Sequence, residues 1–553
     1  WRGYRYQLAS RIPEAEDLHD KVLEVSKKLS EVKPNDSAQY LGRAYWFLAR
    51  FYQDTDQWYE AEQAFRKAMD IINDFEPQDE EGLGAKEDYL AGTFHYLGLQ
   101  LSLLYRLKEA EEYIRKAILI YEKEGRMPHY FSDAFKSGEQ PLLLFAKNIL
   151  AQISYQSGRA LKAEAILREI LDSSEESVIT NMTLFRLAIT LGFQHRWNED
   201  LEIRRTILGN FEKLASKDSD FQISVSGGMG ELCLPLVKTG QYQEAEKIFN
   251  RVIPEYRRLV EEEKPFSESL AIILQNFAIL LGLTGNIHRA KDACLESIDI
   301  FRELVERCSD RFMHRLAAGL GNLSVILLQM GNTKEAQKTM QEAYVIAKEI
   351  SLKHQEATSL AEVYAKVAIN IGAFYEENEN WSNAQRFLDE ARSIVDPRVE
   401  IASEMFLPTV AILDNNLAIL LGERKQFSDA ESQFKDALEI RRNYVKRAEN
   451  LFLPKVASLL NNLGILYRRS GRVDEAEETY KEAIELMEPF AEKEPKVHKS
   501  VLARILNNIL VLYSEVNDSK SADSTRARLR RLGIKEIQSK EQWCIDIEYL
   551  DGY

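Results

Sequence analysis

The sequence predicts an all-α protein built as a solenoid of about twelve antiparallel helix pairs. Three observations lead to this prediction: a motif that recurs every 46 residues, apolar residues spaced three and four apart around it, and short turn-forming stretches between them. A repeat period of roughly 20 to 50 residues is typical of stacked-repeat architectures. Such an array also accommodates 553 residues, more than the roughly 250 to 300 that one compact core can hold.

The motif is clearest in the last third of the chain, where a doubled asparagine precedes an apolar residue three times in succession. The copies are Asn415-Asn416-Leu417, Asn461-Asn462-Leu463 and Asn507-Asn508-Ile509. When the second Asn is taken as a register position, the pattern can be followed back to the first residue. The register positions are 1, 47, 96, 149, 186, 231, 276, 322, 370, 416, 462 and 508.

Two columns of small residues accompany this register. The residue two positions after it is small in every repeat except the last, which has Leu510. The residue fourteen positions after it is alanine in every repeat except one, which has Asp200. Two helices can pack closely only where no bulky side chain separates them. We therefore expect both columns to lie where the helices of a pair cross.

The unit around Asn462 shows both helices of one pair. Apolar residues at steps of three and four surround Asn462 and so occupy one helical face. The pattern breaks at Gly471, and Asp474 and Glu475 then begin a second helix with acidic residues in its first turn. With 46 residues to share, each helix is about 20 residues long, roughly 30 Å.

This unit resembles the tetratricopeptide repeat, whose pattern of apolar, small and aromatic residues is matched by Leu463, Gly464, Tyr467, Ala476, Tyr480 and Ala483. The resemblance implies a right-handed superhelix whose first helices line a concave, ligand-binding groove. The units are longer than the family's usual length of about 34 residues. Long units of this kind resemble those of bacterial multidomain signalling and defence proteins, which commonly carry an NTPase or caspase-like peptidase module. The doubled Asn is similar to that of kinesin light chains, in which such asparagines hold a bound peptide's backbone.

Departures from the period divide the chain. We predict amino-terminal repeats at 1–123, an irregular insertion at 124–141, a main solenoid with a capping helix at 142–532, and an acidic aromatic tail without a clear period at 533–553. The register begins at Trp1 in the middle of a helix, so the first repeat is truncated. We therefore expect this sequence to be a portion of a longer protein with a domain before Trp1.

The asparagines at successive register positions from 276 to 508, called the asparagine ladder below, are the candidate binding site. An amide side chain offers both a donor and an acceptor, which suits the backbone of an extended peptide. The alternative is that these amides bond to the neighbouring repeat and only fix the stack. Arginine and glutamate side chains one to two turns later are expected to select charge in a ligand. The candidate residues are Asn276, Asn322, Asn370, Asn415, Asn416, Asn461, Asn462, Asn507, Asn508, Arg468 and Arg469, with Gln275, Glu377 and Glu423 beside them.

Charge and motif content exclude several classes of function. A net charge of −16 argues against binding nucleic acid or an anionic membrane directly. No phosphate-binding loop, metalloprotease motif or serine-hydrolase motif occurs, so we predict no enzymatic activity, cofactor or metal site. Four cysteines without paired spacing, and the lack of a long apolar run, favour a cytoplasmic protein.

Two smaller features receive structural interpretations. The arginine pairs on second helices are expected to lie on solvated outer faces; they are Arg204-Arg205, Arg257-Arg258 and Arg441-Arg442. The glycine-rich stretch 226–230 is expected to be a loop that precedes a helix.

Together these features predict a non-enzymatic scaffold that binds a protein or peptide in its concave groove. Two alternatives stay open. The chain is a sensor or autoinhibitory region of a larger signalling or defence enzyme whose catalytic domain lies outside this sequence, or it is a receptor for a short signalling peptide.

Overall fold

A computed structural model describes the greater part of the chain. The described residues are 34–54, 57–77, 79–124, 141–173, 178–218, 221–262, 266–533 and 542–550, with five further positions between 21 and 28. Throughout these ranges the regular elements are helices and no strand occurs, which confirms the all-α prediction. The register position at residue 1 and nearly all of the predicted insertion at 124–141 lie outside the described residues.

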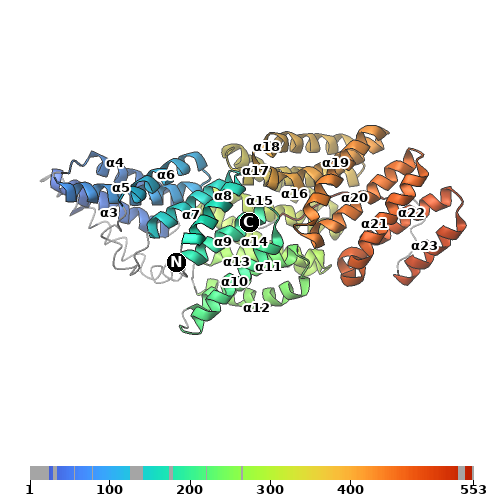
Figure 1. The fold of residues 1–553 in the computed structure, drawn as a ribbon, viewed down its shortest axis with the longest axis horizontal. Coiled ribbons are helices and arrows are strands. Elements are labelled where there is room, and N and C mark those ends of the chain that lie inside the picture. The colour runs from blue at the N-terminus through green and yellow to red at the C-terminus, as the bar shows by residue number, and fades with distance from the viewer. Residues whose placement is uncertain are drawn as a thin grey trace.

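The helices form antiparallel pairs that follow one another along a right-handed solenoid. Helices α3–α6 lie at one end of the molecule and α20–α23 at the other (Figure 1). The pairs are α3 (Pro34–Asp54) with α4 (Trp58–Asp74), α5 (Glu80–Leu103) with α6 (Leu107–Glu124), α7 (Pro141–Gln156) with α8 (Ala160–Ser173), α9 (Val178–Phe193) with α10 (Trp197–Ala215), α11 (Gln222–Lys238) with α12 (Tyr242–Glu261), α13 (Ser267–Leu283) with α14 (Ile287–Arg307), α15 (Ser309–Gln329) with α16 (Thr333–Lys353), α17 (Thr358–Glu377) with the first half of α18 (Trp381–Glu423), the second half of α18 with α19 (Phe427–Val445), α20 (Glu449–Arg469) with α21 (Val473–Lys493), and α22 (Pro495–Glu515) with α23 (Ser519–Arg531).

Helix α18 is two helices of the stack joined end to end. Non-helical backbone at Ala402 (φ −136°, ψ 45°) divides it. By length and composition alone α18 passes the test for a membrane-spanning helix, but 78% of its most apolar window is buried inside the protein. Its apolar character therefore reflects its place in the core.

The structure reproduces the sequence register. Every register position from 47 to 508 falls in the first helix of a pair, and every alanine-column position falls in the second. The column alanines are between 0% and 3% exposed. A Cβ atom added to Gly464 would lie 2.7 Å from the ring of Tyr480, and one added to Gly98 would lie 2.6 Å from Ile114. Small residues are therefore required where the paired helices cross, as predicted.

The turn between the helices of a pair repeats one backbone conformation. Nine residues after each register position from 96 to 508 the φ angle is positive, between 54° and 81°. The next N–H then donates back into the first helix, as Arg472 does to the carbonyl of Tyr467 at 2.9 Å. This is the left-handed cap that ends many helices. The residues are Gly158, Gly240, Gly285, Gly331 and Gly471, and also Tyr105, His195, Glu379, Lys425 and Asn517.

The exception in the alanine column forms a buried ion pair. Asp200 is 0% exposed and lies 2.5 Å from Arg204, which is 3% exposed and also bonds to Glu231 at 2.6 Å. The prediction of a solvated face is therefore wrong for Arg204, and it is wrong for Arg441, which is 2% exposed. Consecutive helix residues point about 100° apart, so one member of an arginine pair faces inward while its neighbour faces solvent.

Repeats far apart in the sequence meet across the superhelix. The Thr358 hydroxyl donates to the carbonyl of Gln156 at 3.0 Å, and the Asn450 amide donates to the carbonyl of Thr239 at 2.7 Å. These bonds span 202 and 211 residues of sequence. Repeats of different turns of the solenoid are therefore in direct contact.

Candidate functional site

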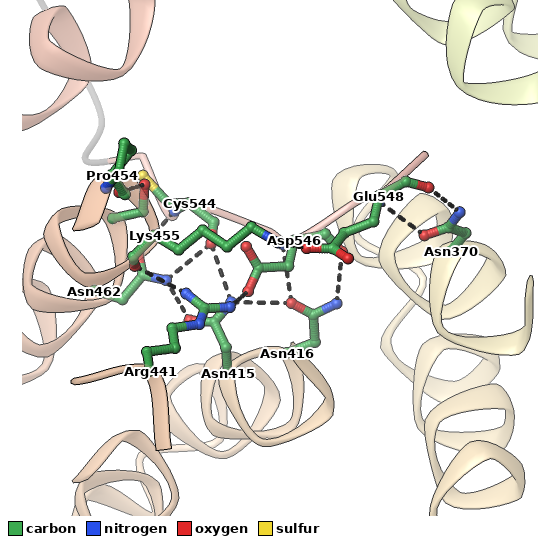
Figure 2. A network of polar contacts seen from close by, with 11 residues as sticks. Asn370, Asn415, Asn416, Arg441, Pro454, Lys455, Asn462, Cys544, Asp546 and Glu548 are labelled. Carbon is green, nitrogen blue, oxygen red and sulfur yellow. Dashed lines mark hydrogen bonds and ion pairs between the residues drawn. The ribbon is translucent and has the colours of Figure 1, made fainter. Parts of the chain in front are cut away.

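Residues 542–550, called the tail below, lie across the first helices of the carboxyl-terminal half of the solenoid. The tail crosses five first helices in reverse order, from α22 through α20, the second half of α18 and α17 to α15. Figure 2 shows its central part passing over the asparagines of neighbouring repeats. The first helices of these repeats therefore form the surface on which the tail lies.

One asparagine in each of these repeats holds one tail residue by both of its backbone groups. The side-chain Oδ1 accepts the residue's N–H and Nδ2 donates to its carbonyl, at distances between 2.6 and 3.1 Å. Every second tail residue is held, which requires an extended chain because its backbone groups alternate in direction. The pairs are Asn508 with Gln542, Asn462 with Cys544, Asn416 with Asp546, Asn370 with Glu548 and Asn322 with Leu550.

The preceding asparagines join adjacent repeats. Asn415 Oδ1 accepts a hydrogen bond from Asn462 at 2.8 Å, and Asn461 Oδ1 accepts one from Asn508 at 2.8 Å. Asn415 also donates to the carbonyl of Cys544 at 3.1 Å. The two roles that the sequence left open are therefore combined, because the same network links the repeats and holds an extended segment.

The remaining ladder residues make different contacts. Asn507 donates to the carbonyl of Ala503 in its own helix at 2.8 Å. Gln275 donates to the carbonyl of Arg315 at 3.5 Å. Asn276, the next ladder position beyond Asn322, is 6% exposed and its Oδ1 has no hydrogen-bond partner in the described part of the chain.

Arg469 and Glu423 contact the tail's tryptophan together. The guanidinium of Arg469 lies 5.0 Å from the ring centroid of Trp543, and it pairs with Glu423 at 2.9 Å. Glu423 also accepts the indole N–H of Trp543 at 2.7 Å. Arg468 pairs with Glu515 of the next first helix at 2.5 Å. Both arginines thus lie on the first helix α20, and their role in selecting a ligand stays a prediction.

The groove is basic where the tail is acidic. Asp546 forms an ion pair with the buried Arg441, whose Nη1 also donates to the carbonyl of Lys455 at 2.9 Å. Glu548 pairs with the Lys455 ammonium (Figure 2). Ionised partners roughly double the strength of a hydrogen bond. The groove therefore offers a guanidinium to Asp546 and, to Glu548, a lysine whose pKa is lowered by burial to about 7, although the whole chain is strongly acidic.

Two aromatic side chains of the tail pack at glycines of the inner helices. Trp543 stacks on Phe434, with ring centroids 6.1 Å apart, and a Cβ on Gly422 would lie 3.3 Å from it. A Cβ on Gly282 would lie 2.1 Å from the hydroxyl of Tyr549. Gly282 and Gly422 both stand six residues after a register position. The same place in two repeats thus lacks a side chain where the tail needs space.

A glycine variant is expected to displace the tail without weakening the helices. In the double variant Gly282→Ala/Gly321→Ala, new methyl groups would clash with Tyr549 and with Leu550, whose Cδ1 lies 2.3 Å from a Cβ built on Gly321. Alanine favours a helix over glycine by about 1 kcal/mol. We expect faster alkylation of Cys544, whose thiol is buried and whose pKa is raised by that burial, with an unchanged or higher Tm.

Matched controls are available in the same fold. Gly84 and Gly209 lie in α5 and α10, and a Cβ on either meets no atom within 4 Å. Alanine at these two positions should leave the alkylation rate of Cys544 at the wild-type value. An unchanged rate in the Gly282/Gly321 variant as well would show that the tail does not rest on these glycines.

A buried carboxyl adjoins the tail's acidic residues. Glu376 stands six residues after the register position of α17, 2% exposed, and its two oxygens have no hydrogen-bond partner among the described residues. Burial, followed by the negative charges of Asp546 and Glu377, raises the pKa of Glu376 well above its usual value. With the tail bound, this carboxyl is therefore neutral over a wider pH range than an exposed glutamate.

Tail binding is expected to weaken as pH rises, through Glu376. The bound state keeps a proton that an exposed glutamate loses near its usual pKa of 4.5, so ionisation opposes binding above that pH. Glu376→Gln removes this effect. We expect the Cys544 protection factor of the Gln variant, referenced to unfolded chain at each pH, to exceed wild type increasingly between about pH 6 and about pH 8. Equal protection at both values would contradict the assignment.

From the sequence we predict an acidic aromatic tail at 533–553, but not that its residues 542–550 bind the asparagines of the repeats. Residues 545–549 read Ile, Asp, Ile, Glu, Tyr, which alternates apolar and acidic side chains. Strict alternation indicates an extended segment with two different faces. That alternation is the signal in the sequence from which the bound segment could have been found.

The described residues contain no group of three or more His, Cys, Asp or Glu side chains that could hold a metal ion. Cys233, Cys294, Cys308 and Cys544 are all buried free thiols. The geometry at the tail is that of a recognition surface, since the side chains that meet it bind backbone groups, carboxylates and aromatic rings.

Comparisons with known proteins agree with the fold. Tetratricopeptide-repeat family models match residues 409–489 and 42–75. No curated protein matches the sequence. Similar solved structures include BtubC from P. vanneervenii (21% identity, TM-score 0.33, covering 47% of this chain and 98% of that one). They also include a chain of the APC/C hetero-tetramer Cut9-Hcn1 (14% identity, TM-score 0.46, covering 94% of this chain and 91% of that one). A third is a Rap protein complexed with Competence and Sporulation Factor (11% identity, TM-score 0.43, covering 81% of this chain and 98% of that one). The chain is therefore a helical-repeat solenoid with tetratricopeptide repeats at residues 42–75 and 409–489.

Proposed function

We propose that this protein is a non-enzymatic scaffold whose concave groove binds an extended acidic peptide, and that its own tail occupies the groove until a partner displaces it. The observation that supports this proposal most directly is the paired hydrogen bonding of alternate tail residues by Asn508, Asn462, Asn416, Asn370 and Asn322. Side-chain amides that bind only the main-chain atoms of the segment they hold accept any sequence able to extend.

The tail is expected to be exchangeable on energetic grounds. Each asparagine contributes two hydrogen bonds of about 1 kcal/mol net. Ordering the two residues that span one repeat costs about 1–2 kcal/mol per residue. The backbone bonds therefore roughly offset the ordering cost, and the side-chain contacts decide whether the segment stays bound.

Those side-chain contacts define the partner. The tail places an aromatic ring at Phe434 and acidic groups at Arg441 and Lys455. A competing peptide is expected to carry an aromatic residue, then acidic residues three and five positions later, as Trp543, Asp546 and Glu548 do. Such a peptide makes the same contacts and releases the tail.

The test uses the full chain and a fluorescently labelled synthetic peptide with the sequence of residues 542–550. Fluorescence anisotropy should show saturable binding, and unlabelled peptide should increase alkylation of Cys544 in the protein. Three peptides separate backbone recognition from nonspecific binding. They are the parent and two isomeric derivatives, one N-methylated at the residues equivalent to 544 and 546 and the other at those equivalent to 545 and 547.

N-methylation at 544 and 546 removes N–H donors that the asparagines accept, whereas the amides of 545 and 547 make none of these bonds. Losing two hydrogen bonds of about 1 kcal/mol each should weaken the first peptide by about thirtyfold relative to the second. Equal weakening by both modifications, or no saturable binding of the parent, would overturn the proposal.

The occupied groove also supports two finer versions of this function. In one, a free peptide of similar length is the ligand, so that the protein is a peptide receptor. In the other, displacement of the tail is the output of a sensor region within a larger signalling or defence protein. Four buried free thiols support a reducing, cytoplasmic setting for either version.

A further inference from the structure

A cavity of about 940 Å³ adjoins the groove at the last described tail residue. Leu550 forms part of its wall, with residues of α9, α11, α13, α15 and α17 forming much of the remainder. The wall is rich in aromatic side chains, among them Tyr155, Phe185, Phe193, Phe211, Tyr256 and Phe266. A space of this size accommodates several peptide side chains, and it is continuous with the site that already holds the tail.

Glycines form one side of this cavity. Gly227, Gly228 and Gly230 belong to α11 and border the space, so the expectation of a loop at 226–230 is wrong. Glycine in a helix interior is unfavourable relative to alanine. A Cβ on Gly230 would approach Ile273 to 3.1 Å, and one on Gly227 would approach the Tyr256 hydroxyl to 3.5 Å. The missing side chains therefore let neighbouring helices approach and leave the cavity open on this side.

The asparagine ladder continues into the cavity wall. Asn276 lies one repeat beyond Asn322, lines the cavity, and is 6% exposed. Its Oδ1 has no hydrogen-bond partner within the described ranges. In the five repeats that follow Asn276 in the sequence, the equivalent Oδ1 accepts a hydrogen bond from a backbone N–H of the tail. An unsatisfied buried acceptor at the same register position is a place for one more backbone N–H.

The wall also carries a cation that lacks a hydrogen-bonded carboxylate at one end. Three basic side chains of the wall are paired with acidic ones: Arg204 with Glu231 at 2.6 Å, Arg311 with Glu268 at 2.7 Å and Lys366 with Glu362 at 2.8 Å. Arg315 also lines the cavity, and its buried Nη1 has no hydrogen-bond partner among the described residues. A guanidinium in such a place favours a carboxylate ligand.

We propose that the cavity is the terminal subsite of the peptide groove. A ligand continuing beyond the position of Leu550 places its second further residue on Asn276 and an acidic group on Arg315. The inference rests on the proposed function and names a further part of the ligand: an acidic residue two or three positions after the residue held by Asn322.

The experiment compares three labelled synthetic peptides on the full chain by fluorescence anisotropy. The first has the sequence of residues 542–550 and ends in an amide. The second adds Ser-Gly-Glu, and the third adds Ser-Gly-Gln, both ending in an amide. The chain's own tail competes equally with all three peptides, so the quantity compared is the ratio of two peptides' affinities for the same protein variant. Protein variants are wild type, Asn276→Ala, Arg315→Gln, and Arg257→Gln as a control outside the cavity wall.

We expect the Glu-extended peptide to bind wild type at least about tenfold more tightly than the first peptide, with the Gln-extended peptide between them. Arg315→Gln should abolish the difference between the Glu and Gln peptides. Asn276→Ala should reduce the affinity that both extended peptides gain over the first peptide. Arg257→Gln, which removes an arginine paired with Glu296 at 2.6 Å on the outer surface, should change none of the ratios.

Each outcome is informative. Binding of the first peptide with no gain on extension, or a gain that survives both cavity variants, would overturn this inference and leave the proposed function standing. If the first peptide fails to bind while the Glu-extended peptide binds tightly and depends on Arg315, the cavity subsite is supported. That result would also show that the asparagine ladder alone is not sufficient to bind a peptide. Failure of all three peptides would overturn both proposals.

Discussion

Replacing both Asn416 and Asn462 by alanine is expected to free the tail and leave the solenoid folded. The two side chains make four hydrogen bonds to the backbone of Asp546 and Cys544. At about 1 kcal/mol each, their loss shifts the bound-to-free equilibrium by about three orders of magnitude. Alkylation of Cys544 should then approach the rate of the unfolded chain, whereas helical circular dichroism should persist.

Asn148→Ala is the matched control for this variant. Asn148 is equally buried, precedes a register position, and bonds to Thr183 at 3.0 Å and to the carbonyl of Leu144 at 3.0 Å. Its removal should lower Tm while Cys544 stays protected. If the Asn416/Asn462 variant instead unfolds at lower temperature with Cys544 still protected, the ladder serves the stack and the tail is held by other contacts.

The Arg441–Asp546 pair gives the second large effect. Removing one partner of a buried ion pair costs about 3–5 kcal/mol. Here release of the tail relieves that cost, because Arg441 then regains water. Asp546→Leu and Arg441→Met should therefore each free the tail. The double variant Arg441→Met/Asp546→Leu should retain it better than either single variant, because an apolar pair leaves no charge unpaired.

Protection factors of Cys544 in these variants form a double-mutant cycle. A coupling of about 3 kcal/mol is the expected sign of a direct pair. The exposed neighbour Arg442, which pairs with Glu482 at 2.5 Å, provides the control, and Arg442→Met should leave the tail in place. Additive effects of Arg441→Met and Asp546→Leu would show that the two side chains act on the tail independently.

The solenoid could be predicted from the sequence because its determinants are local and repeated. Gly464 and Ala476 are small because the two helices of the pair pack closely there, with the Tyr480 ring against Gly464, and the same requirement recurs in each repeat. A small residue required in eleven successive repeats is recognisable in the sequence even though one repeat has Asp200 in place of alanine. The departure itself needed the structure, since only there is Arg204 seen to turn inward and compensate the buried carboxylate.

The occupant of the groove was harder to predict, because the contacts join residues that the repeat does not relate. Asn322 and Leu550 are 228 residues apart, and Arg441 and Asp546 are 105 apart. The ladder showed that an extended backbone would fit, but its amides do not specify a side-chain sequence. The alternation within 545–549 indicates a strand-like segment, and the sequence alone does not show that it lies in the chain's own groove.

Residue-resolved hydrogen exchange of the tail tests the central claim most directly. The amides of Cys544, Asp546 and Glu548 donate to asparagines, and those of Ile545 and Ile547 make none of these bonds. Protection should therefore alternate along the segment, slow at even positions and fast at odd ones, and the alternation should vanish in Asn416→Ala/Asn462→Ala. Uniformly fast exchange, or protection with no alternation, would contradict a tail held by the asparagine ladder.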